Sequence, residues 1–403
     1  MPEYDVVTIG GGLAGAALAR SIAEQGIRVL VLEQTREFKD RVRGENLQPW
    51  GAAEARALGI YDLLLKTCGH EQPWIELFLG PIQMMHRDCR LTTPQAVPIF
   101  NFNHPAMQET LLGTVAQAGA EVRRSVTVEE IRPGGTPTVL VQQDGVVQEI
   151  SARLVVGADG RSSMARRTFQ VQQDAPFLVI AGILFDNMRI PEDTGFVYLN
   201  PQCSYCAYLF PQGDGRVRAY AAWPVAEGVR LQGEREIPQF IERSLQAGVP
   251  PSAFDGVVPS GPLATFDAAD TWVEHPYANG VVLIGDAASS ADPSWGQGLS
   301  ITLRDVRVLR DCLLKSDDWE SACHDYAAEH DRHYGVIHEV THALKDMFVR
   351  SGPEADTRRA RALPLIGADP MRVPDHVLGG PDLPWSDAVR RTFFADEAAA
   401  ESV

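Results

Sequence analysis

The stretch YDVVTIGGGLAGAALARSIAEQGIRVLVLE, residues 4–33, decides the fold of this 403-residue chain. Residues 4–9 form a valine-rich run that predicts a strand buried on both faces, and a G-x-G-x-x-G motif follows at residues 10–15. Residues 16–25 predict a helix, and residues 28–32 predict a second buried strand that ends at Glu33. A strand, a glycine-rich turn, a helix and a second strand that ends in an acid predict a dinucleotide-binding unit.

Each glycine of this motif has its own physical task. Gly10 permits the tight turn, Gly12 lets backbone N–H groups approach a pyrophosphate, and Gly15 lets the helix pack closely on the strand. Glu33 lies where a carboxylate can hold ribose hydroxyls and would repel a 2′-phosphate. The motif alone does not separate NAD from FAD.

Two further loops follow strand-like runs. Residues 154–156 lead into GADGRSSMAR at 157–166, and residues 281–284 lead into GDAASSADPSWGQG at 285–298. Each loop presents an acid, Asp159 or Asp286, and a helix-like run at 299–314 follows the second. Glycines and a proline between a strand and a helix indicate backbone that comes close to a ligand. The sequence therefore predicts a second ligand-binding loop far along the chain from the first.

The middle of the chain has a different character. Residues 104–118 predict a helix, and residues 122–145 predict a small antiparallel meander. The segment 157–166 has the pattern of a strand, a turn and a helix. Residues 176–224 consist of β-branched and aromatic runs separated by turns, which is typical of an antiparallel sheet, and a helix is expected at 235–246. Aromatic side chains on such a sheet, here Tyr198, Tyr205, Tyr208, Tyr220 and Trp223, are expected in the core.

We therefore predict an α/β protein with an inserted domain. A Rossmann-like dinucleotide-binding domain is expected from residues 1–73, 97–172 and 268–345, and an antiparallel β-sheet substrate domain from residues 74–96 and 173–267. Residues 346–403 are expected to form a C-terminal extension, packed and irregular, with a short helix at 387–398, in preference to a lid over the site. Residues 398–403 are expected to be disordered.

The composition of the chain argues against some classes of binding partner. The net charge of −17 argues against nucleic acid and anionic membranes. No run reaches the roughly 18 apolar residues of a membrane span, and the N-terminus lacks the basic region of a signal peptide, so a cytoplasmic location is expected. The six cysteines are then expected as reduced thiols, and the pair Cys203 and Cys206 as structural. No metal site is predicted, and the oligomeric state stays open.

The three motifs, in this order, resemble those of the class A flavoprotein monooxygenases, the fold of para-hydroxybenzoate hydroxylase, over roughly residues 1–345. The resemblance implies a glutathione-reductase-type domain that binds FAD, with the first motif on the pyrophosphate. It implies that the Asp159 motif supports the use of FAD and NAD(P)H, and that Asp286 contacts the ribitol or ribose.

The resemblance also places the second ligand loop at the flavin end of FAD. Gly296 and Gly298 would let backbone pass against the flavin ring, and the helix that begins near Leu299 and Ser300 would point N–H groups at it. Pro293 and Trp295 are the candidates for the substrate face of the ring. The remaining predicted cofactor contacts are Arg43 and His104.

The activity implied by the resemblance is oxygen transfer. NAD(P)H would reduce FAD, O2 would form a flavin C4a-hydroperoxide, and the distal oxygen would hydroxylate or epoxidise an aromatic or polyene molecule. No side chain is expected to act as a covalent nucleophile. Because no second nucleotide fingerprint is present, NAD(P)H is expected to bind transiently in a groove. Three positions depart from the common family pattern, Ser289, Ser300 and His104, which argues against a simple phenol hydroxylase.

Three alternatives stay open. A flavin-dependent halogenase shares the fold, although the W-x-W-x-I-P stretch of many halogenases is absent. A prenyl-chain reductase of the geranylgeranyl type shares it as well. A prenyl-binding chaperone of the GDP-dissociation-inhibitor type is the non-enzymatic alternative, and the intact third motif argues against it.

Overall fold

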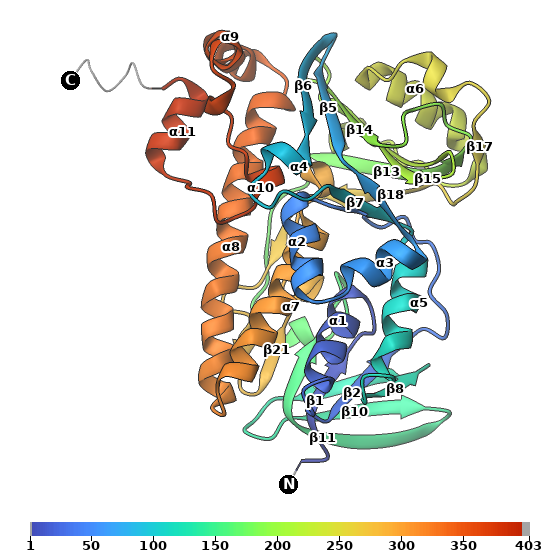
Figure 1. Cartoon of the computed structure of the whole chain (residues 1–403), viewed down its shortest axis with the longest axis vertical. Helices are drawn as coiled ribbons and strands as arrows, with labels where there is room; N and C mark the ends of the chain where they lie inside the picture. The colour runs from blue at the N-terminus through green and yellow to red at the C-terminus, as the bar shows by residue number, and fades with distance from the viewer. Residues whose placement is uncertain (1, 397–403) are drawn as a thin grey trace.

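The structure is a computed structural model that describes residues 2–396. Two large β-sheets are stacked along the long axis, an α/β sheet near the N-terminus and an antiparallel sheet at the opposite end (Figure 1). The disorder predicted for residues 398–403 lies outside the described residues. None of the helices within 2–396 combines the length and the apolar character that a membrane crossing requires.

The α/β sheet is built on the valine-rich strands. Its strand order is β20 (Tyr277–Ala278), β21 (Val281–Leu283), β11 (Val146–Gly157), β1 (Tyr4–Ile9), β2 (Val29–Glu33) and β8 (Glu121–Arg124), parallel except for β20. Side chains alternate between two buried layers: Val6 packs with the helices, and the next residue, Val7, packs with the meander on the other face. The helices of the first layer are α1 (Leu13–Ala23), α5 (His104–Val115) and α7 (Gly298–Lys315). Burial on both faces explains why these strands lack polar alternation.

Two predictions about this half are corrected. The segment at Val122 was expected in the meander, but it forms β8 and pairs in parallel with β2. Ser125 has φ +59°, and this turn separates β8 from the true meander of β9 (Thr127–Arg132), β10 (Thr138–Gln143) and the start of β11. The helix expected after residue 163 is a single 3-10 turn, Ala165–Thr168.

The second sheet is mainly antiparallel. Its order is β17 (Val258–Pro259), β13 (Leu178–Asp186), β16 (Arg216–Pro224), β15 (Tyr205–Gly213), β14 (Thr194–Asn200), β5 (Trp74–Leu79) and β6 (Ile82–Asp88), and β18 (Ala264–Ala268) also pairs with β13. The hairpin β5–β6 joins through a parallel pairing of β5 with β14, although the two strands are distant in sequence. Helix α6 (Ile237–Ala247) covers one face, and the opposite face packs on the C-terminal helices.

Smaller elements join the two halves. These are β3 (Asn46–Leu47), α2 (Pro49–Ala57), α3 (Tyr61–Thr67), β4 (Gly69–Gln72), α4 (Cys89–Thr92) and β7 (Ile99–Phe102). A three-stranded sheet of β12 (Gln172–Gln173), β19 (Thr271–Trp272) and β22 (Ser289–Ser290) lies next to the third motif.

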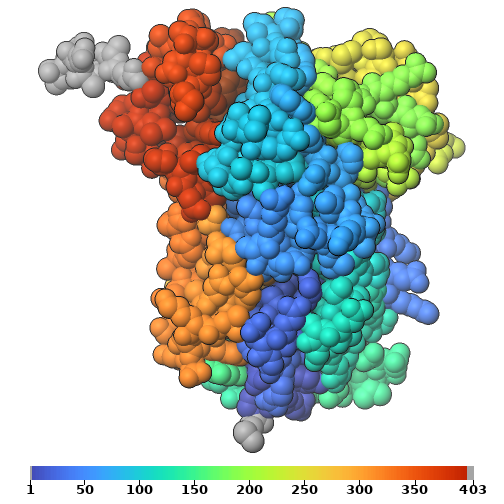
Figure 2. All heavy atoms as spheres, viewed as in Figure 1, coloured from blue at the N-terminus to red at the C-terminus, as the bar shows by residue number. Residues whose placement is uncertain are grey.

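The C-terminal helices form a column beside both sheets. The long helix α8 (Trp319–Phe348) runs from the α/β half to the antiparallel half, and α9 (Pro353–Ala368), α10 (His376–Gly379) and α11 (Asp387–Phe394) follow it (Figure 1). The C-terminal segment lies against the β5–β6 hairpin (Figure 2), where Arg87 forms a 2.6 Å ion pair with Asp375.

The expected irregular tail is corrected by α9. Its buried residues Ala355, Arg359, Ala362 and Ile366 recur at helical spacing and pack against the rest of the protein. Pro353 begins the helix, where proline is tolerated, whereas Pro364 lies inside it. The prolines of this segment are therefore compatible with a helix over Pro353–Ala368, where an irregular tail was expected.

Candidate flavin and substrate site

One cavity of about 1230 Å³ lies between the two sheets, and all three sequence motifs reach it. The predicted site residues that line it are Gly10, Gly12, Glu33, Arg43, His104, Asp159, Asp286, Pro293, Trp295, Gly296, Gly298 and Leu299. Gly15 and Ser300 are the two predicted residues that lie behind its wall.

The first glycines are required by backbone contacts. A Cβ on Gly15 would lie 1.9 Å from the carbonyl oxygen of Gly10, so helix α1 can approach β1 only with glycine there. Gly10 has φ +100°, and a Cβ on it would lie 2.4 Å from the oxygen of Ala158. These contacts press the turn against β11 and bring Gly10 and Gly12 to the cavity.

Glu33 is buried and holds the first turn. Its Oε2 accepts a 2.7 Å hydrogen bond from the N–H of Gly11, and its Oε1 accepts two from Thr35, from the N–H and from Oγ1. A carboxylate oxygen accepts about two hydrogen bonds, so Oε2 keeps capacity for a ligand hydroxyl.

The second motif connects the first motif to the third. The Asp159 carboxylate accepts hydrogen bonds from Ser163 Oγ (2.5 Å) and from the N–H of Met164 (2.6 Å), which shape its own turn. The buried Arg166 then donates from Nε to the carbonyl oxygen of Ala287 (2.8 Å) and from Nη2 to that of Asp286. Arg166 thus fixes the backbone that carries Asp286.

Asp286 faces the cavity with its hydrogen-bonding capacity unused. Within residues 2–396 no protein group donates a hydrogen bond to its carboxylate, and the nearest atom to a Cβ on Gly298 would be Asp286 Oδ1, at 3.9 Å. Removal from water raises the pKa of Asp286, while the charges of Arg43, Arg161 and Arg166 oppose that rise. An acid of this kind fits a ligand that brings hydroxyl donors, as the ribitol or ribose of FAD does.

A buried network holds the same loop from behind. Asp305, on α7, accepts a 2.8 Å hydrogen bond from the N–H of Gly285 through Oδ2. Its Oδ1 contacts Nδ1 of His330 (2.8 Å) and Nε2 of His333 (2.9 Å), both on α8. The start of the third motif is therefore fixed to two packed helices.

Trp295 and Pro293 occupy a short 3-10 turn, Pro293–Trp295, at the cavity wall. Asp292 caps this turn by accepting from the N–H of Ser294 (2.9 Å) and from its Oγ (2.6 Å), and Lys345 of α8 forms a 3.1 Å ion pair with Asp292. The indole of Trp295 is 9% exposed, and its Nε1 has no hydrogen-bond partner in residues 2–396. The Nε1 atom itself is buried, so the indole contributes apolar surface to the cavity wall.

Ser300 has a packing role. Its Oγ accepts a 3.2 Å hydrogen bond from the N–H of Gln48, and a Cβ on Gly51 would lie 2.1 Å from that Oγ. The side chain therefore joins α7 to α2, and Leu299 is its neighbour on the cavity wall. The first turn of α7 still directs its N–H groups toward the cavity end at Gly298.

His104 and Arg43 also line the cavity, near Asp286. His104 contacts the carbonyl oxygen of Gly44 through Nδ1 (2.9 Å), and its N–H donates to Glu45. Desolvation lowers the pKa of His104, so a neutral imidazole faces the cavity at neutral pH. Arg43 is exposed, and Tyr220 donates a 2.7 Å hydrogen bond to its carbonyl oxygen.

The far part of the cavity is an apolar chamber that the sequence did not predict as a unit. Its walls come from the antiparallel sheet, the β5–β6 hairpin, α8 and the C-terminal segment. They are Ile75, Leu77, Met84, Met85, Ile180, Val197, Tyr208, Phe210, Tyr220, Phe266, Leu344, Phe348, Ile366, Val373, Val377 and Leu378. The C-terminal segment is therefore a wall of the chamber.

The sheet aromatics divide between core and cavity. Tyr198, Tyr205 and Trp223 lie in the core under α6, as expected. Tyr208 and Tyr220 line the chamber, so the expectation of core positions is wrong for these two. Tyr208 lies three residues after Tyr205 on β15, and Tyr220 lies three residues before Trp223 on β16. An odd spacing along a strand places the two side chains on opposite faces, which is the sequence signal that distinguishes chamber from core.

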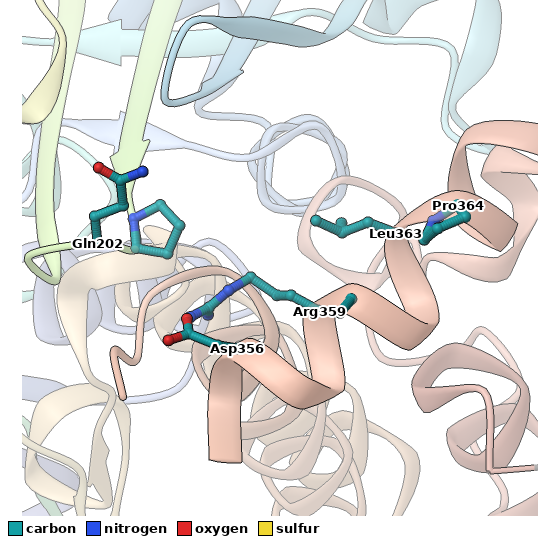
Figure 3. A pocket seen from close by; sticks show the side chains of 7 residues that line it. Gln202, Asp356, Arg359, Leu363 and Pro364 are labelled. Atoms are coloured by element: carbon teal, nitrogen blue, oxygen red, sulfur yellow. The ribbon is translucent and has the colours of Figure 1, made fainter. Parts of the chain in front are cut away.

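A separate pocket lies between α9 and the turn at Gln202 (Figure 3). Its charged groups satisfy each other: Arg359 donates to Asp356 (2.6 Å) and to the carbonyl oxygen of Arg350. No sequence motif reaches this pocket.

The fold and the cavity define a dinucleotide-binding flavoprotein with an attached apolar chamber. The chain belongs to the FAD binding domain family, whose model matches residues 3–318. FAD is therefore its cofactor, and the resemblance read from the motifs is confirmed.

Individual relatives are distant. Squalene epoxidase 3 of Arabidopsis thaliana is 26% identical over 77% of this chain and 60% of its own length. Kynurenine 3-monooxygenase of Salinispora tropica is 27% identical over 96% of this chain and 90% of its own length. The chain spans about 60% of the length of the squalene epoxidases it matches. Among solved structures, Pseudomonas aeruginosa PqsL in complex with 2-aminobenzoylacetate has a TM-score of 0.70 at 23% identity, covering 85% of this chain and 95% of PqsL, and supports the fold.

Proposed function

We propose that the protein is an FAD-dependent monooxygenase that uses NAD(P)H and O2 to hydroxylate or epoxidise an apolar aromatic or polyene molecule. One observation carries the proposal: a single cavity joins the dinucleotide turn at Gly10 and Glu33 to the apolar chamber behind Trp295. When bound, FAD supplies the transfer of electrons from NAD(P)H to O2 and the transfer of oxygen to the substrate.

The chain's own groups bind and orient the cofactor. Glu33 and Asp286, which both line the cavity, would accept hydrogen bonds from the sugar and ribitol hydroxyls of bound FAD. The N-terminus of α7 directs N–H groups and the positive end of its dipole to the flavin end, which favours negative charge there. Arg166 and Asp305 hold the loop between these groups through backbone hydrogen bonds.

The chamber orients substrate and excludes water. Pro293 and Trp295 separate the flavin end from the chamber, and Tyr208 and Phe348 continue the apolar wall. Met84 and Met85 give this wall side chains that adapt to irregular shapes. Such a lining favours a flat or elongated apolar molecule with few polar groups.

We further propose a division of labour along the chain. Residues 1–73, 97–172 and 268–345 serve as the FAD domain, and residues 74–96 and 173–267 serve as the substrate domain, which the pairing of β5 with β14 supports. A cytoplasmic location is supported by the six cysteines, which are all free thiols.

Product analysis under ¹⁸O2 tests the proposal. Purified flavin-loaded protein is supplied with NADH or NADPH and a panel of aromatic and polyene compounds, and products are identified by mass. We expect substrate-stimulated NAD(P)H oxidation and one ¹⁸O atom in the product. Oxygen-independent saturation of a polyene would replace the proposal with a reductase, halide-dependent halogenation with a halogenase, and a colourless protein that binds prenyl groups with a chaperone.

A further inference from the structure

Four side chains converge outside the flavin cavity. Asp174 follows β12, Asp270 precedes β19, and His338 and His342 lie on α8. Asp174 Oδ2 lies 2.9 Å from Nε2 of His338 and 3.0 Å from Nε2 of His342, and Asp270 Oδ2 lies 3.3 Å from Nε2 of His342. One potential ligand atom from each residue lies within 4.8 Å of the other three.

Rigid elements hold these four groups in place. The two histidines are four residues apart on α8, which places both imidazoles on one face of the helix. The two acids are held together because β12 pairs with β19 and the N–H of Asp174 donates a 3.0 Å hydrogen bond to the carbonyl oxygen of Asp270. Asp270 is 1% exposed, whereas the other three are half-buried, so the cluster has one buried side and one accessible side.

The charges of the cluster are not balanced by a basic side chain. Within residues 2–396, neither Asp174 nor Asp270 forms an ion pair with lysine or arginine. The nearby Lys345 is already paired with Asp292.

We propose that Asp174, Asp270, His338 and His342 form a site for a divalent transition-metal ion of the zinc type. Two imidazole nitrogens and two carboxylate oxygens are a donor set that Zn²⁺ accepts in tetrahedral geometry. Tetrahedral ligands at bond lengths of about 2.0–2.1 Å lie roughly 3.3 Å apart. The three imidazole-to-carboxylate separations of 2.9 to 3.3 Å are within a few tenths of an ångström of this value, and all four ligand atoms lie within 4.8 Å of one another. Two carboxylates also neutralise the charge of the ion.

The site would link α8 to the flavin loop. Asp270 Oδ1 accepts a 3.0 Å hydrogen bond from the N–H of Asp292, the residue that caps the Pro293–Trp295 turn. Bound metal would thus fix α8, the β12–β19 pair and this turn to one another. The ion is assigned a structural role, since none of the four residues lines the flavin cavity.

Zinc titration of the flavin-loaded protein tests this inference. After treatment with EDTA and dialysis, Zn²⁺ binding is measured by calorimetry and by competition with a chromogenic chelator. We expect one Zn²⁺ per chain and a rise in melting temperature of about 3–5 °C at a hundredfold excess over the dissociation constant. Cobalt should give visible absorption bands beyond the flavin spectrum that zinc abolishes.

Substitutions of the proposed ligands test whether these residues bind the ion. His338→Ala and His342→Ala should each weaken Zn²⁺ binding by about tenfold or more. Because His342→Ala removes a partner of the buried Asp270, Asp174→Asn serves as a second variant that keeps side-chain volume. His324→Ala is the matched control: it also removes a histidine from α8, one that pairs with His275 on the surface.

Two results would overturn the inference: no stoichiometric binding to the wild-type protein, or binding that is unchanged in His338→Ala, His342→Ala and Asp174→Asn. All readouts are of metal binding, so they stand apart from the outcome of the oxygenation assay.

Discussion

Asp286 is expected to determine how tightly FAD is held. Its carboxylate faces the cavity without a protein donor, so a ligand hydroxyl can supply a charge-assisted hydrogen bond worth about 1.5–3 kcal/mol. Asp286→Ala should therefore weaken FAD binding roughly 10- to 150-fold per hydrogen bond lost. Flavin fluorescence during titration of the apoprotein measures this. The surface substitution Asp255→Ala is the control, and unchanged FAD affinity in Asp286→Ala would contradict the assignment.

Trp295 is expected to protect the reaction more than to retain the cofactor. It lies next to Pro293 in the cavity wall, and its Nε1 is buried without a hydrogen-bond partner among residues 2–396. Trp295→Ala should retain FAD, raise KM for the substrate and increase the yield of hydrogen peroxide per NAD(P)H oxidised, because water enters the site. Trp295→Phe should keep an aromatic wall, so its peroxide yield should stay close to wild type.

The measurement must be made on fully flavinated protein. If Trp295 only packs beneath the loop, Trp295→Ala will lose stability and flavin together, and the peroxide yield of the remaining holoprotein will equal that of the wild type. That combination would remove Trp295 from the substrate face.

At the scale of elements, the contact between α7 and α8 should be sensitive to acid. Burial alone would raise the pKa of Asp305, but the charge of His330 and the hydrogen bonds from His330 and His333 outweigh it and lower the pKa to about 2. Because the folded pKa lies below the unfolded value of about 3.9, this carboxylate contributes stability above pH 4 that is lost between pH 4 and 2. The contribution is about 2–3 kcal/mol.

Asp305→Asn tests this linkage. At pH 7 the variant should be less stable than wild type, because one amide oxygen cannot serve both the Gly285 N–H and the two imidazoles. Below pH 3 the difference should shrink, since wild-type Asp305 is then becoming protonated. Denaturant unfolding at the two pH values measures the difference, and an equal gap at both would refute the role of the charge.

Helices and strands could be predicted from the sequence where a local pattern of residues allows only one type of element. Residues 4–33 determine β1, α1 and β2, because buried strands and a glycine turn leave few alternatives. The helix α9 was not predicted, since its buried face becomes apparent only against the rest of the protein, and the segment was expected to be irregular. The strand β8 was given the wrong pairing partner because four residues, Glu121–Arg124, carry little periodicity.

At the scale of the whole molecule, the ends of the flavin site were predictable and the chamber was not. The residues of the flavin site could be identified because they belong to three glycine-rich motifs. The chamber could not, because its walls come from segments as distant in sequence as Leu77 and Val377. The cluster at Asp174 and His338 has the same origin: the H-x-x-x-H pattern is visible, but only the fold brings the acids to it. Residues in a local motif can therefore be predicted from the sequence, whereas residues that only the tertiary fold brings together cannot.

The distribution of charge leads to a last prediction, on how NAD(P)H reaches the flavin. The chain carries a net charge of −17, which repels an anionic dinucleotide, yet Arg41, Arg43 and Arg167 line the cavity and form no ion pair within residues 2–396. Because the Debye length is about 8–10 Å at physiological ionic strength, the nearby arginines should outweigh the distant acids. KM for NAD(P)H should therefore rise with salt, whereas dominance of the net charge would make it fall.

Arg167→Gln should raise KM at low salt and flatten its salt dependence. The control is Arg235→Gln, because Arg235 is exposed, lies outside the cavity and forms no ion pair within residues 2–396, and it should change neither quantity. Steady-state kinetics between roughly 50 and 300 mM NaCl decide the sign, and a KM that falls with salt would remove these arginines from the path of the nucleotide.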